Sequence, residues 1–179
     1  CFPEQMKGYT ADDVYRAVNL VTPSLIRTEA DEVTYSLHVM VRYELEKRIF
    51  AGELQVKDLP AEWNRLYKEY LNVDVPNDQM GCLQDVHWSG GMIGYFPSYA
   101  LGSAYGPQML HCMEKEVGHI YPDVEKGDLR KVTQWLKENI HRHSGLYKPA
   151  ELFERVCGKF DAKYFTDYLT RKYTELYDL

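Results

Sequence analysis

The chain has 179 residues, and 45% of them are hydrophobic, so it can bury a sizeable core and is not an intrinsically disordered protein. Its net charge is −6 and no basic stripe runs through it, which argues against nucleic acid as a partner. No apolar run approaches the roughly 18 residues that span a bilayer, so no membrane partner is expected.

Nearly every segment has helical periodicity, and the alternating pattern of strands is almost absent. The sequence predicts helices over about 11–22, 28–50, 58–71, 97–117, 129–140, 149–156 and 161–177. Residues 72–82 are predicted to form a loop, and the glycine-rich stretch that follows should be irregular up to about residue 96. We expect an all-α, multi-helix fold that forms a single domain over residues 1–179.

The four cysteines are far apart in the sequence and form no C-x-x-C pair. They are Cys1, Cys82, Cys112 and Cys157. A chain with this much core does not need disulfides, so we interpret them as free thiols in a reducing compartment and expect a cytoplasmic protein.

The first candidate site residue is Arg27, in the segment Ile26-Arg27-Thr28-Glu29-Ala30-Asp31. A guanidinium can bind a carboxylate through two parallel hydrogen bonds. The alternative is a surface ion pair between Arg27 and Asp31, which would lie one turn apart on a helix.

The second candidate segment runs from Gly81 to Trp88 and contains Gln84, Asp85 and His87. In an extended or turn conformation, Asp85 and His87 could point into one cleft, where the imidazole could donate a hydrogen bond to a developing oxyanion. The alternative for His87 is a buried imidazole that bonds to a backbone carbonyl.

Tyr95 and Tyr99 follow at i and i+4, so they would share one face of a helix. A phenol aimed at a cleft can stabilise a tetrahedral intermediate, and the alternative is ordinary aromatic core packing. The histidines His111, His119, His141 and His143 lack the spacing of a zinc helix, so no metal site is predicted within the chain. A fortuitous zinc site among them is the alternative.

The segments I-R-T-E-A-D and G-C-L-Q-D-V-H-W are similar to the I-R-x-x-A-D and G-x-x-Q-D-x-H-W signatures of the carboxypeptidase Taq family of zinc metallocarboxypeptidases. The resemblance covers essentially the whole chain, but only the C-terminal part of the family's α-helical H-E-x-x-H fold. It implies that the complete enzyme removes single residues from peptide C-termini with zinc or cobalt, and that the upstream zinc-binding region is absent here.

The resemblance also implies roles for individual residues. His87 and Tyr99, twelve positions apart, would be catalytic and would act on the oxyanion. Arg27, Gln84, Asp85 and Tyr95 would bind substrate, with Arg27 on the peptide α-carboxylate.

Three hypotheses for the function stay open. The first is the substrate-binding, oxyanion-stabilising region of a metallocarboxypeptidase, inactive without its H-E-x-x-H region. The others are a non-enzymatic helical interaction or dimerisation module, and a stand-alone binder of peptide C-termini. The expected partners are peptide C-termini, the missing N-terminal region of the same protein and a second copy in a homodimer.

Overall fold

The computed structural model describes residues 2–179, so Cys1 lies outside the described residues. This range is built from helices and contains no strand, which confirms the all-α prediction. Cys82, Cys112 and Cys157 are free thiols, as expected for these three. Between residues 2 and 179, no helix has both the length and the apolar character needed to cross a bilayer.

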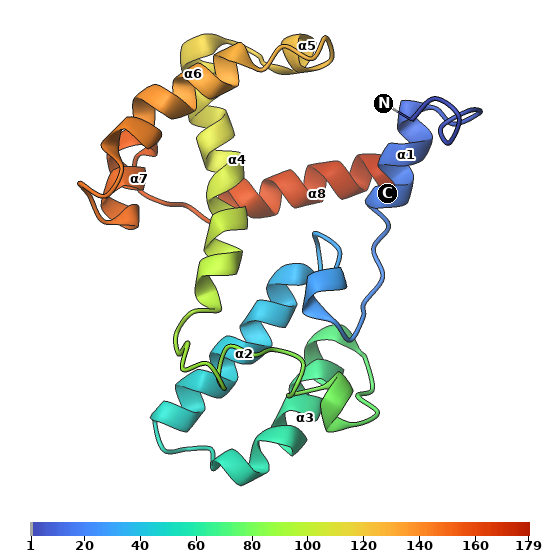
Figure 1. Ribbon diagram of the computed structural model, residues 1–179, viewed down its shortest axis with the longest axis vertical. Coiled ribbons are helices and arrows are strands. Elements are labelled where there is room, and N and C mark those ends of the chain that lie inside the picture. The colour runs from blue at the N-terminus through green and yellow to red at the C-terminus, as the bar shows by residue number, and fades with distance from the viewer. Residues whose placement is uncertain (1) are drawn as a thin grey trace. The chain divides into compact units, whose positions relative to one another are not determined.

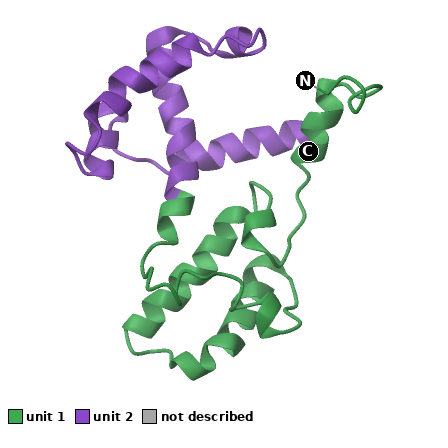
Figure 2. Ribbon diagram, viewed as in Figure 1, with its two compact units in different colours: residues 1–100 green, residues 101–179 purple. Residues whose placement is uncertain are grey.

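The chain divides into two compact units, residues 1–100 and 101–179 (Figure 2). Unit 1 contains α1 (Ala11–Val18), α2 (Tyr35–Phe50), α3 (Leu59–Leu71) and the first residues of α4 (Pro97–Val117). Unit 2 contains the rest of α4, α5 (Tyr121–Val124), α6 (Arg130–Asn139), α7 (Pro149–Cys157) and α8 (Lys163–Tyr177). Short 3-10 turns occur at Arg27–Glu29, Val56–Asp58, Asp78–Met80 and His141–His143. The prediction of a single domain stays a prediction.

Local capping explains where several helices begin. Thr10 and Asp13 form a reciprocal capping box at α1, in which the Asp13 N–H donates to Thr10 Oγ1 at 3.1 Å and the Thr10 N–H donates to Asp13 Oδ2 at 2.8 Å. Pro60 lies in the first turn of α3, where its missing N–H costs no hydrogen bond. Both predicted ends of α4 are confirmed.

The predicted start of α2 near residue 28 is wrong, because the helix begins at Tyr35. Asp31 Oδ1 accepts hydrogen bonds from the N–H groups of Val33 and Thr34, at 3.0 Å and 2.9 Å. These bonds support a turn at 31–34, so Arg27 falls in a separate 3-10 turn upstream of the helix. Two smaller differences are that α1 ends at Val18, before residue 22, and that α5 was not predicted.

The core of unit 1 lies between α2 and α3, which run side by side in Figure 1. Its buried members are Val41, Leu45, Leu54, Trp63, Leu66, Tyr67, Leu71 and Cys82. The Trp63 and Tyr67 rings stack with centroids 5.1 Å apart. Full burial of one large apolar side chain contributes about 1.5–3 kcal/mol. This helix pair is therefore a rigid support for the polar residues that α2 carries.

Unit 2 has its own smaller core around Met113, Ile120 and Trp135. The Trp135 indole N–H donates to Glu116 Oε2 at 2.8 Å, which satisfies the buried donor. The residues predicted for the functional site all lie in unit 1.

Candidate active site

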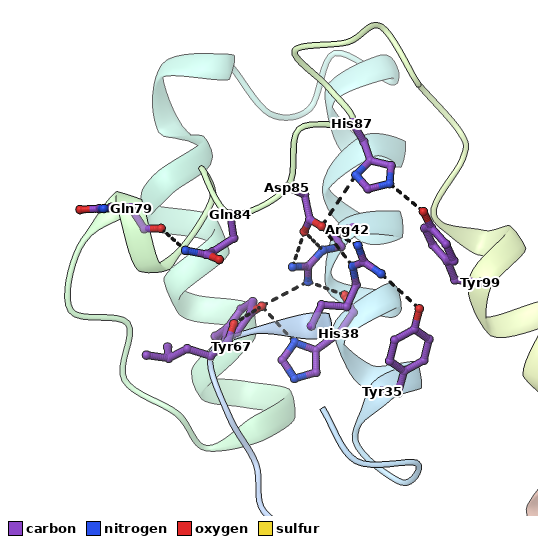
Figure 3. Close-up of polar contacts among 11 residues, drawn as sticks. Tyr35, His38, Arg42, Tyr67, Gln79, Gln84, Asp85, His87 and Tyr99 are labelled. Carbon is purple, nitrogen blue, oxygen red and sulfur yellow. Dashed lines mark hydrogen bonds and ion pairs between the residues drawn. The ribbon is translucent and has the colours of Figure 1, made fainter. Parts of the chain in front are cut away.

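The carboxylate of Asp85 lies at the centre of the site and accepts hydrogen bonds from two arginines (Figure 3). Its Oδ1 accepts from Arg27 Nη2 at 2.7 Å and from Arg27 Nε at 3.1 Å. Its Oδ2 accepts from Arg42 Nε at 2.7 Å, and Arg42 Nη2 lies 2.6 Å away. Three segments are thereby joined: the 3-10 turn at Arg27, helix α2 and the loop that contains Asp85.

All three charged groups are buried: Arg42 is 0% exposed, and the side chains of Arg27 and Asp85 are 7% and 9% exposed. Burial alone would raise the pKa of Asp85, but the Arg42 charge and the hydrogen bonds from Arg27 and Arg42 hold that pKa below its ordinary value. Two cations and one anion leave the cluster with a surplus positive charge. Such a cluster favours an anionic ligand.

His87 lies beside this cluster and contacts Tyr99. Its Nε2 is 2.9 Å from the Tyr99 hydroxyl, and its Nδ1 is 3.7 Å from Asp85 Oδ1, which is too long for a hydrogen bond. Nδ1 is buried and has no hydrogen-bond partner among the described residues. The alternative in which His87 bonds to a backbone carbonyl is therefore wrong, because within residues 2–179 its hydrogen bond goes to a phenol.

Tyr99 contacts both His87 and Arg27. The guanidinium carbon of Arg27 lies 4.7 Å from the centroid of the Tyr99 ring, and the Tyr95 ring meets Tyr99 edge-on at 5.3 Å. Burial raises the pKa of the Tyr99 phenol above its usual value, so the phenol keeps its proton at neutral pH and can donate a hydrogen bond. Tyr95 itself is 45% exposed, which leaves its ring accessible to a ligand.

The guanidinium of Arg27 is only partly occupied. Its Nε and Nη2 donate to Asp85, and its Nη1 donates to the Tyr35 hydroxyl at 3.1 Å. A guanidinium has five N–H groups, so two of them, one on each Nη nitrogen, have no hydrogen-bond partner within residues 2–179. Two N–H groups match the two oxygens of a carboxylate.

One sequence-based alternative does not hold at this site, and one predicted site residue points away from the cluster. The Arg27–Asp31 pair does not form, because Asp31 Oδ2 accepts from the Thr22 N–H at 3.0 Å and Arg27 pairs with Asp85. The side chain of Gln84 turns away from the cluster and donates to the backbone carbonyl of Gln79 (Figure 3). The structure therefore brings together Arg27, Asp85, His87, Tyr95 and Tyr99 but not Gln84.

Behind Asp85 lies a layer of buried polar groups that was not predicted from the sequence. Arg42 Nη1 donates to the His38 carbonyl at 2.7 Å and to the Tyr67 hydroxyl at 3.2 Å. Tyr67 in turn donates to the Leu25 carbonyl at 3.1 Å. The signal for this layer was the polar series His38, Arg42 and Glu46 at intervals of four on α2, a helix that buries Val41 and Leu45 in the core.

No three His, Cys, Asp or Glu side chains within residues 2–179 lie close enough together to hold a metal ion. The four histidines of unit 2 do not form a cluster of this kind. The candidate site in unit 1 brings together the guanidinium of Arg27, the imidazole of His87 and the phenol of Tyr99. These hydrogen-bond donors suit an anionic ligand rather than a cation.

The chain is similar in sequence and structure to known carboxypeptidases. The family profile described as "Carboxypeptidase Taq (M32) metallopeptidase" matches residues 1–173. Carboxypeptidase 1 of Bacillus subtilis is 44% identical over 98% of this chain and 35% of its own length, and thermostable carboxypeptidase 1 of Thermus thermophilus is 44% identical over 93% and 33%. The crystal structure of the M32 carboxypeptidase from Deinococcus radiodurans R1 aligns with a TM-score of 0.95, 43% identity, and coverage of 99% of this chain and 36% of that one. The chain thus spans about a third of the length of the relatives it matches.

Proposed function

The chain belongs to the carboxypeptidase Taq (M32) family of metallopeptidases, and from that premise we propose that it supplies substrate-binding and oxyanion-stabilising residues to a metallocarboxypeptidase. The observation that carries the proposal is the convergence of three groups. Arg27 lies over the Tyr99 ring at 4.7 Å, and His87 meets the Tyr99 hydroxyl at 2.9 Å. A cation can bind the free carboxylate of a peptide C-terminus, and an imidazole and a phenol can stabilise an oxyanion, which are two of the tasks in hydrolysis at a C-terminus.

In this proposal the peptide α-carboxylate binds to Arg27. The two remaining N–H groups of Arg27 can form a bidentate pair with it, and the surplus positive charge of the Arg27–Arg42–Asp85 cluster attracts it. Asp85 fixes the plane of the guanidinium, so little side-chain freedom is lost on binding. Tyr95, half-exposed next to Tyr99, offers an aromatic surface to the terminal residue.

The same proposal assigns Tyr99 and His87 to the oxyanion. The Tyr99 phenol stays protonated at neutral pH and can donate to the oxygen that gains negative charge in the tetrahedral intermediate. The hydrogen bond to His87 orients the phenol before substrate binds. Such preorganised donors lower the barrier because they need no reorientation during the reaction.

Membership in a metallopeptidase family implies a metal, but residues 2–179 do not provide ligands that fit one. We therefore propose that zinc or cobalt is held by residues outside this chain, and the roles assigned above are limited to contacts with the peptide. The homodimer, the cytoplasmic location and the contribution of Gln84 to substrate binding likewise stay proposals.

The 179-residue chain alone is expected to release no terminal residue from peptides when Zn²⁺ or Co²⁺ is added. The reason is that no described side-chain cluster can bind the metal. Amino-acid release from a short peptide, measured by mass spectrometry on a sample whose helical content has been checked by circular dichroism, tests this. Robust release would contradict the assignment of the metal ligands to another part of the enzyme.

In the metal-loaded carboxypeptidase that contains this chain, Arg27→Ala and Tyr99→Phe should have different kinetic effects. Loss of Arg27 removes a contact made equally in the ground and transition states, so KM should rise about tenfold with little change in kcat. Loss of the Tyr99 hydroxyl removes a hydrogen-bond donor to the oxyanion, so kcat should fall about tenfold to a hundredfold. The decrease should be smaller than for loss of the only donor, because His87 can still donate to the oxyanion.

Steady-state kinetics with one peptide substrate measures both effects. Tyr9→Phe is a matched control, because Tyr9 is 67% exposed and lies far in sequence from the site. Equal changes in KM and kcat for both site variants would argue against the two separate roles.

A further inference from the structure

Glu46 is a buried carboxylate that is held by two N–H groups instead of a cation. It lies on α2 and is 6% exposed. Its Oε1 accepts from the Trp88 indole N–H at 2.6 Å, and its Oε2 accepts from the backbone N–H of Gly94 at 3.1 Å. Among residues 2–179 it makes no ion pair. A buried carboxyl group without hydrogen-bond partners is costly, so these two hydrogen bonds stabilise Glu46 in its buried position.

The two donors lie at opposite ends of one loop, residues 88–94. The loop closes on itself, because the N–H of Met92 donates to the carbonyl of His87 at 2.8 Å. Gly91 and Gly94 have φ angles of 74° and 71°, a conformation that side chains rarely adopt. Glu46 thus connects the first residue of this loop, Trp88, to its last residue, Gly94, through one hydrogen bond to each.

The residues that flank the loop belong to the candidate active site. His87 directly precedes Trp88, and Tyr95 directly follows Gly94. Phe96, which is fully buried, packs against the Trp88 ring at 5.8 Å and against the His87 ring at 4.5 Å. Movement of either loop end would therefore be transmitted to His87 and, through Phe96, to the first turn of α4 that carries Tyr99.

We propose that Glu46 is a positioning residue for the His87–Tyr99 pair. Its two carboxylate oxygens fix both ends of loop 88–94 to the rigid helix α2, and this sets the 2.9 Å contact between His87 Nε2 and the Tyr99 hydroxyl. Glu46 contacts neither of these two side chains through its own hydrogen bonds. The catalytic consequence rests on the proposed function, whereas the positioning itself does not.

Glu46→Gln is the variant that tests the proposal, because its carboxamide is nearly isosteric but has one acceptor and one donor. The amide NH₂ must face either the Trp88 N–H or the Gly94 N–H, so one end of the loop is released. In the chain, hydrogen exchange should accelerate about tenfold or more at whichever donor is released, the Gly94 amide or the Trp88 indole N–H, and the His87 ring resonances should shift in NMR spectra. In the metal-loaded enzyme, kcat should fall about tenfold to a hundredfold with KM changed less than about twofold.

The control is Glu44→Gln on the same helix, which removes only an exposed pair with Lys47 and should change none of these quantities. If Glu46→Gln lowers the melting temperature but leaves the His87 resonances and kcat as in the parent, Glu46 is merely structural and the inference is overturned. If Glu46→Gln shifts the His87 resonances while Tyr99→Phe leaves kcat unchanged, the positioning stands and the proposed function fails.

Discussion

Replacement of Asp85 by asparagine is expected to destabilise the protein by about 3–5 kcal/mol, which is the usual cost of breaking a buried ion pair. Asp85 is the shared anion of Arg27 and Arg42, and both guanidiniums are buried. An asparagine would leave two buried positive charges without a counter-charge and would point an N–H₂ group at one of them. Urea unfolding of the chain, followed by circular dichroism, measures the loss.

Two further variants make this prediction sharp. Asp128→Asn removes the partner of Arg130, which is a surface pair with the arginine 90% exposed, and should leave the urea midpoint unchanged. Asp85→Glu keeps the charge on a longer side chain, so it should fold with a smaller loss even if Asp85→Asn does not fold. An Asp85→Asn protein as stable as the parent would mean that other groups balance Arg27 and Arg42.

The helices of this fold were predictable where a local signal and the apolar periodicity agree. For α4, Pro97 at the start and Gly118 just after the end mark both boundaries, and both were correct. For α2, the periodicity extends upstream of the true start, so it could not show that the side chain of Asp31 turns back on the N–H groups of Val33 and Thr34. Because of these hydrogen bonds, α2 begins only at Tyr35, and Arg27 lies in a separate 3-10 turn before it.

The ion-pair partner of Arg27 could not be predicted from spacing along the sequence. On a helix, Asp31 would lie one turn from Arg27, but the observed partner is Asp85, which is 58 residues away in the sequence. Only the packing of the 81–88 loop on α2 brings Asp85 to it, and a single sequence contains no measure of that distance. The resemblance to a known family grouped Arg27 with His87 and Tyr99, which lie together in the structure, and with Gln84, whose side chain bonds to the Gln79 backbone instead.

Helix α2 is the element that organises the site, because two buried residues one turn apart hold two different segments. Arg42 binds Asp85 and, through it, Arg27. Glu46 binds Trp88 and Gly94 at the ends of the following loop. The groups that we propose to contact substrate thus come from a 3-10 turn, a loop and the first turn of α4, while the groups that fix them come from a helix packed in the core, which is a common way to build a precise site.

His38 should make the stability of this unit depend on pH between about 4 and 6.5. The imidazole is 0% exposed, and its Nδ1 lies 3.1 Å from the Tyr67 hydroxyl. Because Tyr67 already donates its proton to the Leu25 carbonyl, Nδ1 of His38 must be the donor, which makes the ring the neutral Nδ1–H tautomer. Burial, together with the nearby charge of Arg42, lowers the pKa of His38 to about 4.

An unfolded histidine binds its proton near pH 6.5, whereas folded His38 does so only near pH 4, so the unfolded state holds more protons in this window. Stability is therefore complete above about pH 6.5 and falls as the pH is lowered, by a total of about 3 kcal/mol at pH 4. Urea unfolding at several pH values should reveal this slope, and His38→Asn, which keeps an N–H for Tyr67, should flatten it. His141→Asn, a change at an exposed histidine, is the matched control. The comparison uses the change of unfolding free energy with pH and not the free energy itself, so the cavity that asparagine leaves does not affect the result. If this pH dependence is unchanged in His38→Asn, other groups cause the acid sensitivity.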